Sequence, residues 1–203
     1  MTKSRKRSDT SKKRSDKSRK KTKLERMEGQ DVPNIVLKTR VKSKKKDEFK
    51  WKDVPSRRLF KGKKIVAFSV PGAFTPTCTT THLPSYEHMY SKLKKLGVDD
   101  VYCISVNDPF VMYNWGKKLH IKKVKLIPDG NGDFTKKMGA LIKKNNLGFG
   151  DRSWRYSMYV SDGKIKKIFA EPYMSHNYKK DPLSYSNVET MIDYLEHHTD
   201  SNL

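Results

Sequence analysis

Apolar residues in the chain form two kinds of pattern, which alternate along its middle part. Continuous β-branched and aromatic runs are typical of buried strands, and three such runs cover 65–70, 101–106 and 124–128. Apolar residues spaced three and four apart are typical of amphipathic helices, and three such segments cover 79–96, 110–119 and 134–141. Strands that alternate with helices predict an α/β fold with a central sheet between helices.

Both ends of the patterned region predict further elements. Segments 34–41 and 49–54 are expected to pair as strands around a basic turn at 42–46. Segments 156–160 and 165–169 flank Ser161-Asp162-Gly163-Lys164, which is typical of a β-hairpin. A last helix is predicted over 188–197. A terminal hairpin makes the sheet mixed, so we expect a central mixed β-sheet flanked by helices on both faces.

Charge is distributed unevenly over the 203 residues, whose length suits one domain. Residues 1–26 hold a net charge of +10 out of the total of +23, and Leu24 is their one apolar aliphatic side chain after Met1. Such a segment buries too little apolar surface to offset its ordering entropy. We therefore expect a disordered basic arm over 1–30 and one folded domain over 31–203.

Several functions remain open for the arm. Residues 3–23 could act as a nuclear-localisation-like signal, as a weak binding site for polyanions such as nucleic acid, or as a contact to an anionic membrane surface. A solvated tail without a partner is equally compatible. The sequence has no apolar run of eighteen residues, so no membrane span is expected. Two cysteines suggest a reducing compartment, hence a cytoplasmic location, with the nucleus open through the arm.

The candidate chemistry lies where the first buried run ends, in Val70-Pro71-Gly72-Ala73-Phe74-Thr75-Pro76-Thr77-Cys78. A Pro-Gly pair breaks the strand and a helical pattern begins after it, so Cys78 is expected within the first helical turn. There the helix dipole and unpaired N–H groups favour the thiolate, which is the reactive form of cysteine. Thr75 lies one turn earlier, close enough for its hydroxyl to reach the sulfur, and Pro71 stiffens the loop.

A nucleophilic thiolate also needs a cation, and the candidates are Arg152 and Arg155 in Gly150-Asp151-Arg152-Ser153-Trp154-Arg155-Tyr156. Both precede a predicted strand, and a guanidinium there could pair with a thiolate and bind an incoming oxygen. Spacing alone does not separate this role from that of two ordinary surface arginines.

The segment PGAFTPTC resembles the peroxidatic motif of peroxiredoxins, and TTHLP, SVNDPFVM and SWRYSM extend the similarity to the peroxiredoxin-5 and plant type II group. That group includes bacterial hybrids fused to glutaredoxin. The resemblance implies a thioredoxin-like fold and a thiol peroxidase that reduces hydrogen peroxide and organic hydroperoxides. It also implies that Cys78 is the nucleophile, Thr75 hydrogen-bonds the peroxide and the sulfur, Arg155 is the active-site arginine and Pro71 shields the pocket. Arg152 falls outside this set.

The resemblance leaves the reductive half of the cycle open. Some relatives place a resolving cysteine in the region that reads Met174 to Pro182 here, where this chain has none. Cys103 matches a second cysteine of plant type II members, but its apolar strand favours an inert core thiol. We therefore predict a one-cysteine cycle in which glutathione, as a co-substrate, or glutaredoxin reduces the sulfenic acid, without a bound cofactor or metal.

Two further expectations concern partners. The family often dimerises through the face that bears the active-site loop, so a homodimer is expected. The alternative to an enzyme is a nucleic-acid-associated redox sensor, in which the arm binds phosphate and Cys78 reports oxidation.

Overall fold

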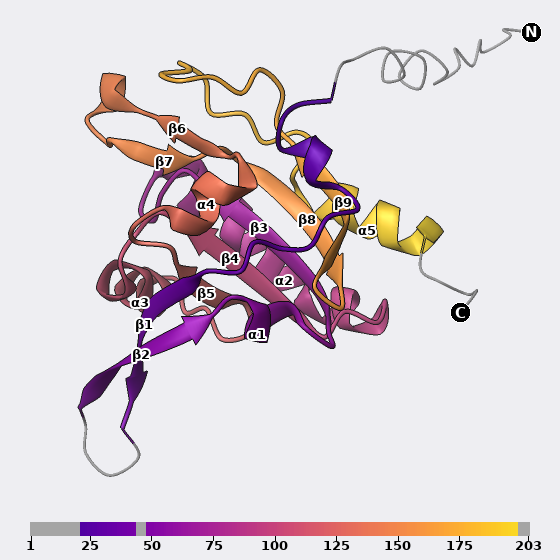
Figure 1. Cartoon of the computed structure of the whole chain (residues 1–203), viewed down its shortest axis with the longest axis horizontal. Coiled ribbons are helices and arrows are strands. Elements are labelled where there is room, and N and C mark those ends of the chain that lie inside the picture. Colours follow the sequence, from indigo (N-terminus) through magenta and orange to yellow (C-terminus); the bar gives the residue numbers. More distant parts are fainter. Residues whose placement is uncertain (1–20, 44–47, 199–203) are drawn as a thin grey trace, which may run out of the picture.

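A five-stranded mixed sheet forms the centre of the computed structural model, which describes residues 21–43 and 48–198 (Figure 1). The strand order is β5-β4-β3-β8-β9. The strands are β3 (Lys64–Val70), β4 (Asp100–Ser105), β5 (Lys125–Pro128), β8 (Tyr156–Ser161) and β9 (Lys164–Ala170). The first three run parallel, whereas β8 is antiparallel to both β3 and β9. The prediction of a central mixed sheet is confirmed.

Three helices cover one face of this sheet: α2 (Leu83–Lys95), α3 (Pro109–Lys118) and α5 (Val188–His198). The apolar faces of these helices pack on the side chains that β3 and β4 direct toward them. Trp115, Tyr86 and Phe68 are fully buried in this layer. Asp108 accepts hydrogen bonds from the N–H groups of Phe110 and Val111 and so caps the start of α3.

Shorter elements cover the other face, as Figure 1 shows. These are η1 (Glu25–Met27), β1 (Val36–Lys42), β2 (Phe49–Pro55), α1 (Arg57–Phe60) and α4 (Asp133–Met138). β1 and β2 form a separate antiparallel pair, as predicted. Leu37 of β1, Phe60 of α1 and Phe134 of α4 are the core residues that this layer contributes. Residues 44–46 of the basic turn expected over 42–46 lie outside the described residues, and Lys42 is the last residue of β1. Helices or short helical turns thus lie on both faces.

The helix predicted over 134–141 is too long. α4 ends at Met138 because Gly139 adopts φ 75°, a left-handed conformation that terminates helices. Leu141 begins a strand instead, β6 (Leu141–Lys143), which pairs with β7 (Asp151–Ser153) around η3 (Asn145–Leu147). Strands of three residues are too short to show a period, which is why the sequence pattern missed this hairpin.

The predicted boundary of the arm at residue 30 is also corrected. Leu24 is fully buried in the core, and the N–H of Gly29 donates to the carbonyl of Ile165 at 2.8 Å. Glu28 accepts a hydrogen bond from the N–H of Ile168 at 3.0 Å. The chain therefore packs against the core and β9 from Leu24 onward, and residues 1–20 lie outside the described part.

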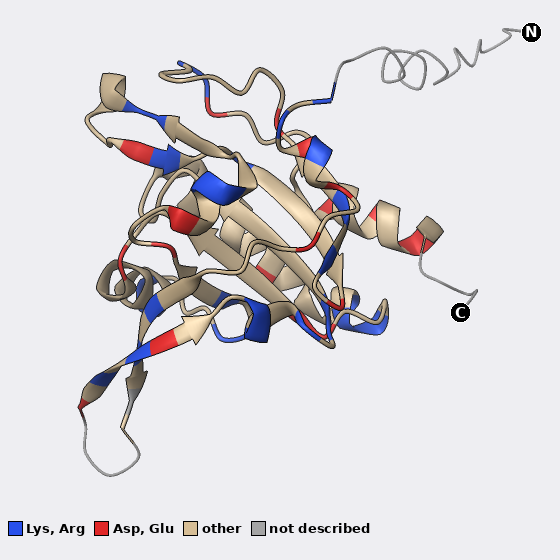
Figure 2. Cartoon of the chain, viewed as in Figure 1, with Lys and Arg blue, Asp and Glu red and all other residues tan. Residues whose placement is uncertain are grey.

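Charged side chains lie mainly around this core. Figure 2 shows the central strands largely without charge and lysine and arginine spread over the surrounding helices, turns and edge strands. None of the helices within the described ranges is long and apolar enough to cross a bilayer.

Candidate active site

Cys78 lies in the connection between β3 and the helix that follows it. After the loop at 71–75 the chain turns helical at Pro76, and the N–H of Thr79 donates to the carbonyl of Thr75 at 3.0 Å. The helix widens into a π-helical stretch, η2 (Cys78–His82), before α2. Cys78 is therefore in the first turn, where backbone N–H groups lack helical partners, and its side chain is fully buried.

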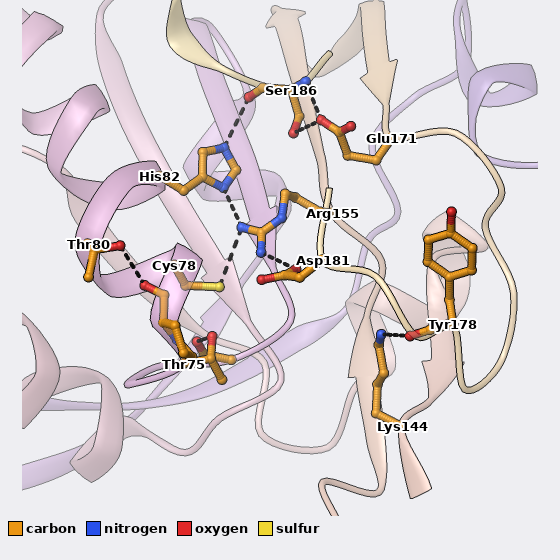
Figure 3. A network of polar contacts seen from close by, with 12 residues as sticks. Thr75, Cys78, Thr80, His82, Lys144, Arg155, Glu171, Tyr178, Asp181 and Ser186 are labelled. Atoms are coloured by element: carbon orange, nitrogen blue, oxygen red, sulfur yellow. Dashed lines mark hydrogen bonds and ion pairs between the residues drawn. The ribbon is translucent and has the colours of Figure 1, made fainter. Parts of the chain in front are cut away.

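The strand register places Arg155 beside this turn. Tyr156 pairs with Ser69 across the antiparallel β3–β8 ladder, so Arg155 lies at the end of β3 from which the Cys78 loop departs. Its Nη1 donates to Cys78 Sγ at 3.4 Å, as Figure 3 shows. Arg155 and Cys78, which are far apart in the sequence, are thus brought together in the core.

Two further side chains hold the guanidinium of Arg155. Nη1 also donates to His82 Nδ1 at 3.0 Å, and Nη2 donates to Asp181 Oδ1 at 2.5 Å (Figure 3). Burial acts to lower the pKa of Arg155, but the negative charges of Cys78 and Asp181 outweigh it and raise that pKa above its ordinary value. Arg155 therefore stays cationic although it is buried.

His82 is a neutral acceptor in this network. Its Nε2 lies 3.0 Å from the carbonyl of Ser186, which can only accept, so Nε2 carries the proton and Nδ1 receives the Arg155 hydrogen bond. Burial, followed by the charge of Arg155, lowers the pKa of His82 from 6.5 to about 3. Sequence reasoning missed this residue, although its spacing of four from Cys78 places both on one helical face.

Thr75 and Pro71 shape the loop before Cys78. The hydroxyl of Thr75 donates to the carbonyl of Gly72 at 2.8 Å, so its proton is directed into the loop and its lone pairs remain as acceptors. A Thr75–Cys78 hydrogen bond is not among the contacts of the described residues. Pro71 is buried beside Gly72, and the N–H of Ala73 donates to Asn107 Oδ1 at 2.9 Å, which ties the loop to the end of β4.

Comparison with known proteins identifies the family. Residues 27–183 match the family model described as Redoxin. Peroxiredoxin sll1621 of Synechocystis sp. is 53% identical over 173 residues, which cover 84% of this chain and 92% of that protein. The chain belongs to the redoxin family and is a peroxiredoxin. The hybrid peroxiredoxin hyPrx5 of Haemophilus influenzae is 47% identical over 169 residues, covering 83% of this chain and 66% of that protein.

A solved peroxiredoxin has the same fold. The crystal structure of the Plasmodium falciparum antioxidant protein, described as a 1-Cys peroxiredoxin, matches with a TM-score of 0.80 and 36% identity. The match covers 84% of this chain and 99% of that chain. The expected thioredoxin-like peroxiredoxin fold is thereby confirmed.

Arg152 of this peroxiredoxin serves a different purpose from Arg155. Its Nη1 donates to the carbonyl of Val106, just beyond the end of β4, and burial lowers its pKa. The two candidate arginines thus separate in space: Arg155 contacts the thiol, and Arg152 fastens the β6–β7 hairpin to the sheet.

Cys103 is the second thiol, in the middle of β4 and fully buried in the same core as Cys78. Burial raises its pKa well above the ordinary value, and the charge of Cys78 acts in the same direction. A thiol with a raised pKa holds little of the thiolate form, which is the form that reacts with peroxide. Within the described part of the chain, no cluster of three or more histidine, cysteine or acidic side chains could hold a metal ion.

Proposed function

We propose that this peroxiredoxin reduces hydrogen peroxide and organic hydroperoxides at Cys78 and is recycled by glutathione or glutaredoxin. The observation that carries the proposal is the hydrogen bond from buried Arg155 Nη1 to Cys78 Sγ at 3.4 Å, at the start of a helix. A cation in such a dry site is worth far more to a developing negative charge than the same cation in water.

In the first half-reaction, the Cys78 thiolate attacks the nearer peroxide oxygen and the O–O bond breaks. The sulfur is oxidised to a sulfenic acid, and the distal oxygen leaves as hydroxide or alkoxide, which takes up a proton to give water or an alcohol. Arg155 stabilises negative charge on the sulfur before the attack and on the two oxygens during it. In this role it is the active-site arginine.

His82, Thr75 and Pro71 support this step in different ways. Neutral His82 fixes Nη1 of Arg155 without competing for its charge. Thr75 has lone pairs free to accept a hydrogen bond from a peroxide O–H, since its own proton is donated to Gly72. Buried Pro71 lacks an N–H group and keeps water from the sulfur.

In the second half-reaction, one glutathione thiolate attacks the sulfenic sulfur, which releases water and leaves a mixed disulfide. A second thiolate, from glutathione or glutaredoxin, then attacks the glutathione sulfur of this disulfide, which releases the Cys78 thiolate and leaves oxidised glutathione or a glutaredoxin–glutathione disulfide. Two observations support an external thiol: the sequence contains only one other cysteine, Cys103, and that thiol is deep in the core. The likeness to a solved 1-Cys peroxiredoxin and to a hybrid peroxiredoxin points the same way.

The test is a peroxide-consumption assay with three reductants: glutathione alone, glutathione with glutaredoxin, and thioredoxin. We expect turnover with the first or second, none with Cys78→Ser, and full turnover with Cys103→Ser. Turnover with thioredoxin alone, or a Cys78–Cys103 disulfide formed as fast as peroxide is consumed, would contradict the one-cysteine cycle. Reaction once per chain with none of the three reductants active would favour a redox sensor.

We also propose that the chain forms a homodimer through the face next to the active-site loop. Phe74 of that loop and Phe110 and Tyr113 of α3 are about half exposed, and Trp51 of β2 contacts Phe110 edge-on at 5.9 Å. Monomers rarely expose such clusters. Sedimentation velocity should show a dimer for the natural chain and a monomer for Phe110→Glu, and a monomeric natural chain would contradict the proposal.

The binding of polyanions through residues 3–23 stays a prediction, because most of that segment lies outside the described residues. Deletion of residues 1–20 should abolish salt-sensitive binding to an oligonucleotide and leave peroxide reduction unchanged.

A further inference from the structure

The segment 171–187, between β9 and α5, forms no helix or strand and passes directly over Arg155. It is fastened at both ends. Glu171 Oε1 accepts hydrogen bonds from the N–H groups of Ser184, Tyr185 and Ser186, at 3.0, 2.9 and 2.8 Å. The segment therefore has a defined path although it lacks regular structure.

A second attachment holds the middle of this segment to the β6–β7 hairpin. Lys144 Nζ donates to the carbonyl of Tyr178 at 2.6 Å (Figure 3). The N–H of Asn177 donates to the carbonyl of Lys143 at 2.7 Å. Asp181 lies between the two attachments. The path of the segment thus determines where the carboxylate of Asp181 can lie.

Asp181 connects the surface to the buried arginine. Its side chain is 41% exposed, whereas that of Arg155, to which it is paired, is 2% exposed. The contact to Nη2 matters because Arg155 Nε has no hydrogen-bond partner in the described part of the chain. The plane of the guanidinium is therefore held by His82 at Nη1 and by Asp181 at Nη2, and not from the Nε side.

We propose that Asp181 is a positioning residue for peroxide reduction, which fixes the guanidinium plane so that Nη1 of Arg155 faces Cys78. The inference rests on the proposed function. Without Asp181, the His82 contact alone would leave the planar group free to rotate about the axis through that hydrogen bond. The Nη1–Sγ contact would then be lost for part of the time.

The effect is one of geometry more than of charge. The carboxylate of Asp181 helps to raise the pKa of Arg155, but a guanidinium stays protonated at neutral pH without such help, so Arg155 keeps its charge when Asp181 is lost. The hydrogen bond, in contrast, needs only an oxygen acceptor at the right place, which an amide also provides. Asp181→Asn should therefore preserve the function that Asp181→Ala removes.

The experiment uses the full chain and single-turnover oxidation of reduced protein by hydrogen peroxide. We expect Asp181→Ala to slow this reaction about 10- to 100-fold, as misplacement of a reacting group by about 1 Å does. Asp181→Asn should retain most of the rate. The matched control is Lys180→Ala, which removes a neighbouring exposed side chain that takes no part in the hydrogen bonds described above, and it should react like the natural chain.

A second measurement separates positioning from general damage. Alkylation of Cys78 by iodoacetamide uses the thiolate but none of the Arg155 contacts to peroxide oxygens. Asp181→Ala should therefore slow the peroxide reaction by a larger factor than the alkylation. If Asp181→Ala slows the peroxide reaction and the alkylation by equal factors, the proposal is overturned. The same holds if Asp181→Ala and Lys180→Ala both shift the midpoint of thermal unfolding.

The remaining outcomes also decide. Equal loss in Asp181→Ala and Asp181→Asn would assign the effect to charge and overturn the inference, as would an Asp181→Ala variant as fast as the natural chain. If the natural chain itself does not react with peroxide, the proposed function fails. If it reacts and the Asp181 variants do not differ from it, the inference alone fails.

Discussion

The surroundings of Cys78 and of Cys103 differ although both thiols are fully buried in the same core. Cys103 lies within β4, opposite Phe68 of β3, and burial raises its pKa. Cys78 lies beyond the end of β3, in a first helical turn, and receives a hydrogen bond from a buried cation. The comparison predicts that burial alone keeps a thiol unreactive, and that Cys78, against which the fold places a cation, is the thiol that attacks peroxide.

The largest difference should appear when each sulfur is replaced in turn. Cys78→Ser removes the proposed nucleophile, so reduction of hydrogen peroxide should fall to the uncatalysed background. Cys103→Ser leaves the site intact, so its single-turnover rate should match that of the natural chain. The rates are followed by stopped-flow peroxide consumption. If Cys103→Ser reacts much more slowly with peroxide but unfolds normally, Cys103 takes part in the reaction and the two thiols do not differ as described.

The second test exchanges the cation. Arg155→Gln keeps hydrogen-bonding groups but removes the charge, and we expect the rate of peroxide reduction to fall about 10²- to 10³-fold, as for other lost electrostatic donors. Arg152→Gln is the matched control, because that side chain contacts the Val106 carbonyl and not the thiol. If the rate of peroxide reduction falls by a similar factor in both variants, contact with the thiol does not distinguish the catalytic effects of the two arginines.

The third test uses pH. The unfolded chain binds a proton at His82 below about pH 6.5, whereas the folded chain excludes it until about pH 3. Between these values the unfolded state binds more protons, so the free energy of unfolding falls as pH falls, by up to about 1.4 kcal/mol per pH unit. Urea unfolding at pH 7, 6 and 5 gives the free energy of unfolding at each pH. This free energy should depend less steeply on pH in His82→Gln than in the natural chain. An unchanged slope would mean that His82 is not buried as a neutral ring.

The smallest effect concerns the stability contributed by the inert thiol. Cys103→Ser places a hydroxyl among apolar side chains of β4, and an unpaired buried hydroxyl costs about 1–3 kcal/mol. The urea concentration at the unfolding midpoint should therefore be lower, while the dependence of the free energy of unfolding on urea concentration stays the same. A midpoint equal to that of the natural chain would indicate that the serine finds a partner, so that the Cys103 site is more polar than described.

Much of the fold followed from the sequence because its signals are local. The run 65–70 and the Pro-Gly break after it place Cys78 correctly, and the Asp108-Pro109 cap marks the start of α3. The resemblance to peroxiredoxins singled out Arg155 over Arg152, which spacing did not. Its contact with Cys78 is a consequence of the β3–β8 register, to which no local pattern refers.

The rest of the site depends on tertiary contacts. Asp181 reaches Arg155 because segment 171–187 is held by Glu171 and Lys144, and neither attachment has a sequence signature. His82 appeared in the sequence as one histidine among six. The basic composition of residues 1–26 extends the predicted arm over Leu24, whose burial depends on core residues of strands far away in the sequence.

Residues 29–32 also protect one edge of the central sheet. β9 is an edge strand of the sheet, and an unprotected edge strand can pair with other chains and cause aggregation. Here residues 29–32 run alongside it: Ile165 N–H donates to the Gln30 carbonyl at 2.9 Å, and Val32 N–H donates to the Gly163 carbonyl at 2.8 Å. Residues 29 and 30, which the sequence assigns to the arm, thus pair with the start of this edge strand. A chain that begins after residue 32 would leave the N–H and the carbonyl of Ile165 without these partners, and we expect it to aggregate more readily.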